Sequence, residues 1–177
     1  MSIQTSDILL KLSTTTGPGN STAGSPNSSL GGFISTTQVT NNSLHNLFDE
    51  ISGTENAASE SEYRCVFVHN SNATDTFFNV IAFISAEVAG GADVAIGVDA
   101  VAASAVGATD AQADDVVDED TAPSGVAFTS PTVSANGIDI GDLASGEVRG
   151  VWIRRTTANT VALENDGATL RVQGESL

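Results

Sequence analysis

The chain has 177 residues, with 22 acidic residues against six basic ones and a net charge of −16. This length suits one domain with a hydrophobic core, and the acidic balance disfavours binding to nucleic acid or to an anionic membrane surface. A single cysteine, Cys65, excludes an internal disulfide. Because no run of eighteen apolar residues is present and the start is polar, we expect neither a membrane span nor a signal peptide.

Residues 1–30 are predicted to form an N-terminal arm of low complexity ahead of a β-domain at 31–177. Residues 8–12 are apolar, which fits either a strand or an anchoring arm. Residues 13–32 consist almost wholly of Ser, Thr, Gly, Asn and Pro, so in isolation they would be flexible. Two alternatives remain open: a partner holds this segment, or it folds back along its own domain.

A strand is expected at residues 32–40, followed by one short helix at residues 42–52. Four apolar residues in the second segment recur at helical spacing, namely Leu44, Leu47, Phe48 and Ile51. Asn42 or Ser43 could cap the start of this helix, and Gly53 could end it. Two turns are too short to be stable alone, so the helix is expected to dock on the sheet.

The densest apolar stretch is residues 62–85, which is predicted to form two strands at 63–69 and 76–85 joined by a six-residue turn. Aromatic and β-branched residues fill both strands on both faces, which is typical of strands in the middle of a covered sheet. We therefore place the core in this hairpin.

Further strands are expected at residues 93–99, 126–129, 148–156, 161–164 and 169–173, with Ile138 and Ile140 alternating in another. Residues 100–124 are rich in alanine, glycine and acids, which favours an exposed excursion. Many short strands that do not alternate with helices predict an all-β fold. The expected architecture is an antiparallel β-sandwich, of jelly-roll or immunoglobulin-like kind, with a docked helix and an extended N-terminal arm.

No group of residues forms a recognised catalytic, cofactor or metal motif. The acidic run Asp114, Asp115, Asp118, Glu119 and Asp120 lacks the spacing of an EF-hand loop, so it is interpreted as a solvated loop. His45 and His69 form no zinc motif, and His69 is interpreted as a capping or surface residue. Serines are abundant, but no nucleophile elbow accompanies them. We expect no enzyme activity, cofactor or metal.

Arg154 and Arg155 are the one basic feature that could mark a contact. Adjacent strand residues point to opposite faces, so both cannot be buried on one side. In the simpler interpretation they neutralise nearby acids of the same chain. In the sharper one, an arginine forms a bidentate bond with a carboxylate of a neighbouring subunit.

Four blocks of the sequence carry a resemblance to a known family: SSLGGFIS, LHNLFDEISGTENAASESEYRCVFVHNSNAT, DTAPSGVAFTSP and IGDLASGEVRGVWIRRTT. In their order and spacing they resemble a family of small virion structural proteins of tailed bacteriophages. The similarity runs from Ile3 to near the C-terminus. The chain departs from the family pattern at SESE, where the family has a Gly-Asp turn before EYRC, which puts that turn in doubt.

The resemblance implies a non-enzymatic component of the virion and fits a capsid decoration, or cement, protein on the outer surface of the capsid. Its partners would be the major capsid protein and copies of itself, as a trimer, with no nucleic acid and no membrane. Candidate assembly contacts are apolar residues of the arm and the two arginines: Ile3, Ile8, Leu9, Leu10, Arg154 and Arg155.

The alternative is a β-sandwich module of a tail fibre, a baseplate or a tail decoration that recognises host glycan. Such a module is expected to expose an aromatic side chain near a loop. A decoration protein is expected to bury Trp152 and Tyr63.

Overall fold

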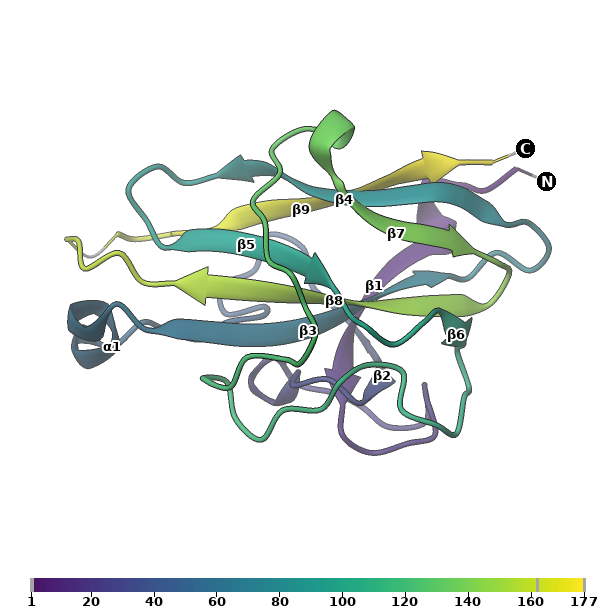
Figure 1. Ribbon diagram of the computed structural model, residues 1–177, viewed down its shortest axis with the longest axis horizontal. Coiled ribbons are helices and arrows are strands. Elements are labelled where there is room, and N and C mark those ends of the chain that lie inside the picture. Colours follow the sequence, from purple (N-terminus) through teal and green to yellow (C-terminus); the bar gives the residue numbers. More distant parts are fainter. Residues whose placement is uncertain (1, 162, 177) are drawn as a thin grey trace.

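The computed structural model describes residues 2–161 and 163–176, and it confirms the all-β sandwich (Figure 1). About 40% of the chain is strand and 9% is helix, and two antiparallel sheets pack together. The larger sheet contains β1 (Ile8–Thr14), β2 (Phe33–Gln38), β3 (Ser61–Asn70), β5 (Asp93–Val98), β6 (Ser104–Ala105) and β8 (Glu147–Thr156). Its order is β2-β1-β3-β8-β5, and β6 pairs with β8.

The smaller sheet has the order β7-β4-β9, formed by β7 (Ile138–Leu143), β4 (Phe77–Glu87) and β9 (Ala168–Glu175). The one α-helix of the described residues, α1 (Gly53–Ala58), lies at one end of the sandwich, at the left in Figure 1. Short 3-10 turns occupy η1 (Thr5–Asp7), η2 (Pro26–Ser28) and η3 (Ser134–Asn136).

The larger sheet is buried on both faces, and alternation along β3 sorts its side chains between two cores. Val66 and Val68 point into the core between the sheets, together with Val151 and Ile153 of β8. On the opposite face, Cys65 and Phe67 join Trp152 and residues of two long loops, including Leu30, Ala113, Val116 and Phe128. The loops at residues 15–32 and 106–130 thus form a third, irregular layer.

The two strands of the predicted hairpin exist, but their pairing was wrong. β3 pairs with β1 and β8 in the larger sheet, and β4 pairs with β7 and β9 in the smaller one. The link between them crosses from sheet to sheet, and the Asn70 side chain closes it by donating to the carbonyls of Asp75 and Leu143, each at 2.9 Å. Each strand lies between two others in its own sheet, so both of its edges are paired without the other.

The helix predicted at residues 42–52 was also wrong, because the chain there makes turns and the helix begins at Gly53. Asn42 and His45 have φ angles of 53°, which an α-helix cannot contain. Ser52 caps α1 instead: its hydroxyl accepts from the Glu55 amide at 3.2 Å, and the Glu55 carboxylate accepts from the Ser52 amide. Of the four apolar residues, Leu47 is buried and Phe48 packs against the core, whereas Leu44 is 69% exposed.

The N-terminal residues form part of the sandwich and not a separate arm. β1 lies between β2 and β3, and Leu12 is buried in the main core. The low-complexity segment that follows is held by its own domain: the buried Ser29 hydroxyl accepts from the Ser13 amide at 2.8 Å and donates to the Cys65 carbonyl at 2.6 Å. Of the two alternatives for this segment, the structure has the one in which it folds back.

Two smaller strand predictions differ from the structure. Thr129 contributes a single bridge to Ile96 of β5 in place of a strand at 126–129. No strand includes the described residues of 161–164, and residue 162 lies outside the described part of the chain. Val161, Leu163 and Glu164 belong to a long loop between β8 and β9 and are exposed.

Gly31 provides a test of how the irregular layer is packed. Its φ is +96°, and an added Cβ would overlap the carbonyl oxygen of Asp114 in the facing loop. Gly31→Ala is therefore expected to lower the free energy of unfolding by more than about 2 kcal/mol, measured by urea denaturation. Gly53→Ala is the matched control: nothing lies within 4 Å of its Cβ position, so a change within about 1 kcal/mol is expected. Equal effects of the two substitutions would contradict this packing.

Candidate functional site: a buried arginine–carboxylate network

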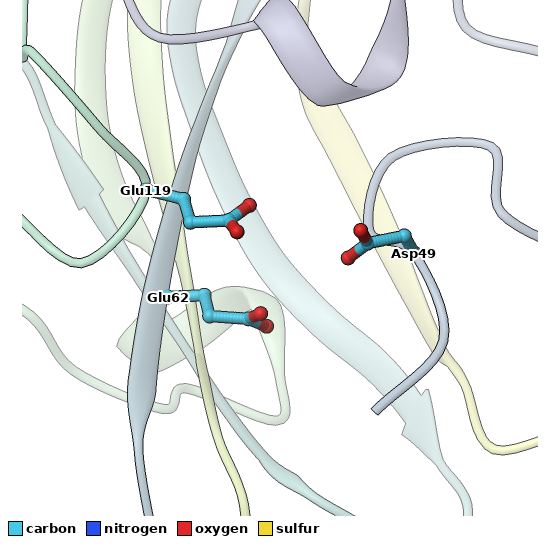
Figure 2. A group of neighbouring side chains, drawn as sticks. All are labelled: Asp49, Glu62 and Glu119. Atoms are coloured by element: carbon cyan, nitrogen blue, oxygen red, sulfur yellow. The ribbon is translucent and has the colours of Figure 1, made fainter. Parts of the chain in front are cut away.

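Two arginines and three carboxylates meet at the end of the sandwich where α1 lies. Glu62 and Arg64 come from β3, and Arg155, which is opposite Glu62 in the strand register, comes from β8. Asp49 belongs to the loop before α1, and Glu119 to the irregular layer. Figure 2 shows the carboxylates of Asp49, Glu62 and Glu119 facing a common space.

Arg155 joins two of these segments. Its Nε donates to Glu62 Oε2 at 2.6 Å, its Nη1 donates to the Asp49 carbonyl at 2.6 Å, and its Nη2 lies 3.6 Å from Asp49 Oδ1. Arg64 joins the third segment by an ion pair between its Nη2 and Glu119. Because Glu62 and Arg64 are almost wholly buried, the network ties both loops to the centre of the sheet.

Phe48 lies beside both guanidinium groups. The centre of its ring is 4.7 Å from Cζ of Arg155 and 5.4 Å from Cζ of Arg64, within the range of cation–π attraction. One aromatic side chain from the loop at residues 41–52 therefore packs against both cations, which explains why this loop needs no helix to dock.

Burial has the largest effect on the pKa of Glu62. Loss of solvent raises the pKa of its carboxyl above the ordinary value, and the neighbouring Arg155 opposes that rise. Desolvation therefore offsets part of the attraction within the pair, and we interpret the network as specifying how the loops dock. Removing one member would leave its partner buried and unpaired.

The three carboxylates come close enough to suggest a cation site, since one oxygen of each lies within 4.8 Å of the others. Two guanidinium groups already neutralise these acids, and a metal ion would have to displace them. The arrangement therefore fits a structural ion-pair network better than a metal centre. It also holds no nucleophile or general base that the fold leaves unused.

The other residues of the acidic run do not converge. Asp114 accepts from the Ser124 amide at 2.6 Å, and Asp118 accepts from the Thr121 hydroxyl at 2.6 Å. Within the described chain, Glu119 is the one member of the run that belongs to a group of three close carboxylates. Asp114 and Asp118 thus each accept a hydrogen bond within their own loop, and Glu119 pairs with Arg64.

A second buried polar group holds the irregular layer to the sheet on the opposite face. The Asp99 carboxylate accepts from Trp152 Nε1 at 2.6 Å, from the Asp114 amide at 2.9 Å and from the Val101 amide at 2.7 Å. Gln112 works in the same way, accepting from the Ile34 amide and donating to Ser104 and to the Ala105 carbonyl. These side chains satisfy backbone groups that regular pairing leaves free.

The structure does not bring the predicted assembly residues together. Ile8, Leu9 and Leu10 lie in β1, and Ile3, Ile8 and Leu10 pack against the main core. Ile8 is opposite Asn70 and Arg154 is opposite Tyr63, so the two sets lie toward opposite ends of β3. Three of the four apolar residues are therefore packed inside the domain, and Leu9 belongs to neither hydrophobic cluster.

Arg154 and Arg155 point to opposite faces, as adjacent strand residues should. Arg155 neutralises acids of its own chain in the network described above. Arg154 lies over the Phe128 ring at 5.4 Å on the other face, and no carboxylate among the described residues pairs with it. The simpler interpretation thus fits Arg155 but not Arg154.

His69 is buried, so its interpretation as a capping or surface residue was wrong. Its Nδ1 has no hydrogen-bond partner among the described residues. Burial lowers the pKa of the imidazole to about 4, and the positive charge of nearby Lys11 adds to this effect. The ring is therefore neutral at pH 7 in the folded chain.

The sequence held partial signals for the network. Glu62 and Arg64 are two residues apart on a strand, which places opposite charges on one face, and S-G-T-E at residues 52–55 matches a capping box. Neither signal reveals Asp49, Phe48 or Glu119, because their positions depend on loops.

Comparison with protein-family models, with curated proteins and with solved structures finds no match for this chain. In the described part of the chain, no helix has the length and apolar character needed to cross a membrane.

Arg155→Met tests the network. It leaves Glu62 buried without its cation, so the free energy of unfolding is expected to fall by about 3–5 kcal/mol in urea denaturation. Glu62→Leu is the second single variant, and the double variant Glu62→Leu/Arg155→Met leaves neither member of the pair buried without its partner. We expect the double variant to lose less unfolding free energy than the sum of the losses of the two single variants. Arg171→Met on the exposed face of β9 is the control, with a change within about 0.5 kcal/mol. Additive losses would show that the pair is not coupled.

His69 predicts a pH dependence of stability. In the unfolded chain the imidazole titrates near 6.5, but in the folded chain near 4, so the unfolded state binds the proton first as the pH falls. The neutral imidazole therefore adds to the free energy of unfolding. This contribution is complete above pH 6.5 and is lost as the pH falls to about 4. Its size is at most about 3 kcal/mol, and less to the extent that solvent screens the ring. In urea denaturation at pH 7 and pH 4.5, His69→Gln should lose less stability on acidification than the unaltered chain; an equal loss would refute the assignment.

Proposed function

We propose that this chain is a non-enzymatic virion structural protein of a tailed bacteriophage, which binds the outer surface of the capsid as a decoration protein. It would bridge and stabilise neighbouring major capsid subunits, and would assemble with copies of itself as a trimer. The proposal rests first on the resemblance of four sequence blocks, and then on what these blocks do in the fold.

The observation that carries the proposal is that residues of separate blocks meet in one buried network. Phe48, Asp49, Glu62 and Arg64 come from the block at residues 44–74, and Arg155 comes from the block at 140–157. The residues that make the chain similar to virion proteins are therefore structural ones, which specify how loops dock on a sheet. They specify a fold and not a reaction, which is consistent with a structural role.

The distribution of charge supports an exterior position. Arg64 and Arg155 are paired inside the fold, while the chain carries 22 acidic residues. An acidic exterior does not compete for packaged nucleic acid and limits non-specific association between particles. Interfaces of standard size bury about 1,600 Å², and repetition over a shell would multiply modest contacts into a large total stabilisation.

The alternative, a glycan-binding module of a tail fibre, baseplate or tail decoration, would need an aromatic side chain open to a sugar. All nine aromatic residues lie in the described part of the chain, and each of them is buried or partly buried. Trp152 is 0% exposed, and Tyr63 packs against Phe128 with ring centres 5.5 Å apart. This favours the decoration hypothesis over the glycan one.

Direct imaging of the virion that contains this chain tests the proposal. Electron cryomicroscopy of purified particles is expected to show density of this fold on the outer capsid surface, and quantitative mass spectrometry is expected to count many copies per particle. The recombinant chain is expected to sediment with particles stripped of it. Density in the tail, a few copies per particle, or absence from purified virions would refute the proposal.

A further inference from the structure

Exposed aliphatic side chains gather at the α1 end of the sandwich. Leu44 is 69% exposed, Val161 is 86% and Leu163 is 44%, and Leu44 and Leu163 line a hollow of about 390 Å³. The loop that carries Val161 and Leu163 is fixed at this end, because Thr160 donates to the Gly90 carbonyl and accepts from the Asn56 side chain of α1. Figure 1 shows this loop beside the β4–β5 connection, at the left.

The hollow has an acidic rim. Its other lining residues are His45, Glu50, Glu164 and Asn165, and neither lysine nor arginine lines it. Glu50 and Glu164 are exposed, and no ion pair among the described residues neutralises either of them. We call Leu44, Val161 and Leu163, with Glu50 and Glu164, the loop-end patch.

We propose that the loop-end patch is the surface that docks on the capsid, and that its partner is a segment of the shell protein with apolar residues flanked by lysine or arginine. This inference rests on the proposed function and names the contact it would use. An apolar centre loses water on docking, and its charged rim selects a partner of opposite sign.

Charge decides against a second copy as the occupant. A copy that docked by the same patch would place Glu50 and Glu164 against the same two residues, in a chain whose net charge is −16. Like charges set together across an interface cost affinity, whereas a cationic partner gains it. The patch also assigns a role to the β8–β9 loop, whose residues Val161 and Leu163 belong to neither hydrophobic cluster.

Co-sedimentation with capsids stripped of this chain tests the proposal with matched variants. Leu44→Ser/Val161→Ser/Leu163→Ser removes the apolar centre and is expected to weaken binding at least tenfold. Val117→Ser/Val133→Ser is the control, because these residues are also exposed, Val117 to 86%, but lie in other loops. The control is expected to bind like the unaltered chain.

Charge reversal tests the rim separately. Glu50→Lys/Glu164→Lys is expected to weaken binding at least tenfold at low salt, and the difference should shrink as salt screens it. Asp110→Lys/Asp120→Lys alters the net charge equally at exposed positions elsewhere and is expected to change binding less than threefold. All the substituted residues are at the surface, so each variant is expected to fold. Thermal unfolding of each variant checks this.

The docking surface and the proposed function are contradicted by different results. If the unaltered chain binds capsids and the patch variants bind equally well, the patch is not the docking surface, although the proposed function stands. If the unaltered chain does not bind, both fail. Sedimentation equilibrium of the chain alone gives the last outcome: self-association that the patch variants abolish would assign the patch to a second copy and overturn the proposal.

Discussion

The fold depends on the burial of β3 on both faces. Val66 and Val68 need one apolar layer, and Cys65 and Phe67 need another, so a single sheet packed on one side cannot satisfy the strand. The smaller sheet covers one face and the irregular layer covers the other. The order of the low-complexity segment follows, because its serines and glycines must pack closely and satisfy backbone groups over Trp152 and Phe67.

At one end of β3 the arginine–carboxylate network holds loops against the sheet, as apolar packing does at the centre of the strand. Two loops arrive there, and each brings a carboxylate to an arginine of the sheet. Buried ion pairs are a poor source of net stability, and we infer that these pairs fix which loop docks where. The same end carries the loop-end patch, so the network would hold Leu44 and Glu50 in place through their neighbours Phe48 and Asp49.

Residues that sequence reasoning assigned to assembly have mainly internal roles. Ile8 and Leu10 resemble an apolar arm because the sequence does not show that β1 is inserted between β2 and β3. Arg155 resembles an exposed cation because its partners Glu62 and Asp49 lie far from it in the chain. The surface that remains for a partner lies on loops, whose positions depend on the packed domain.

The sequence by itself determined the all-β class and most of the strands, because alternation and β-branched residues act over a few neighbouring positions. It also determined that Arg154 and Arg155 face opposite ways. The tertiary structure decided that β3 and β4 belong to different sheets, that the helix begins at Gly53, and that Phe48, Glu62 and Arg155 meet. These features depend on contacts between residues distant in sequence, and at Asn42 and His45 on backbone angles that only the docked loop imposes.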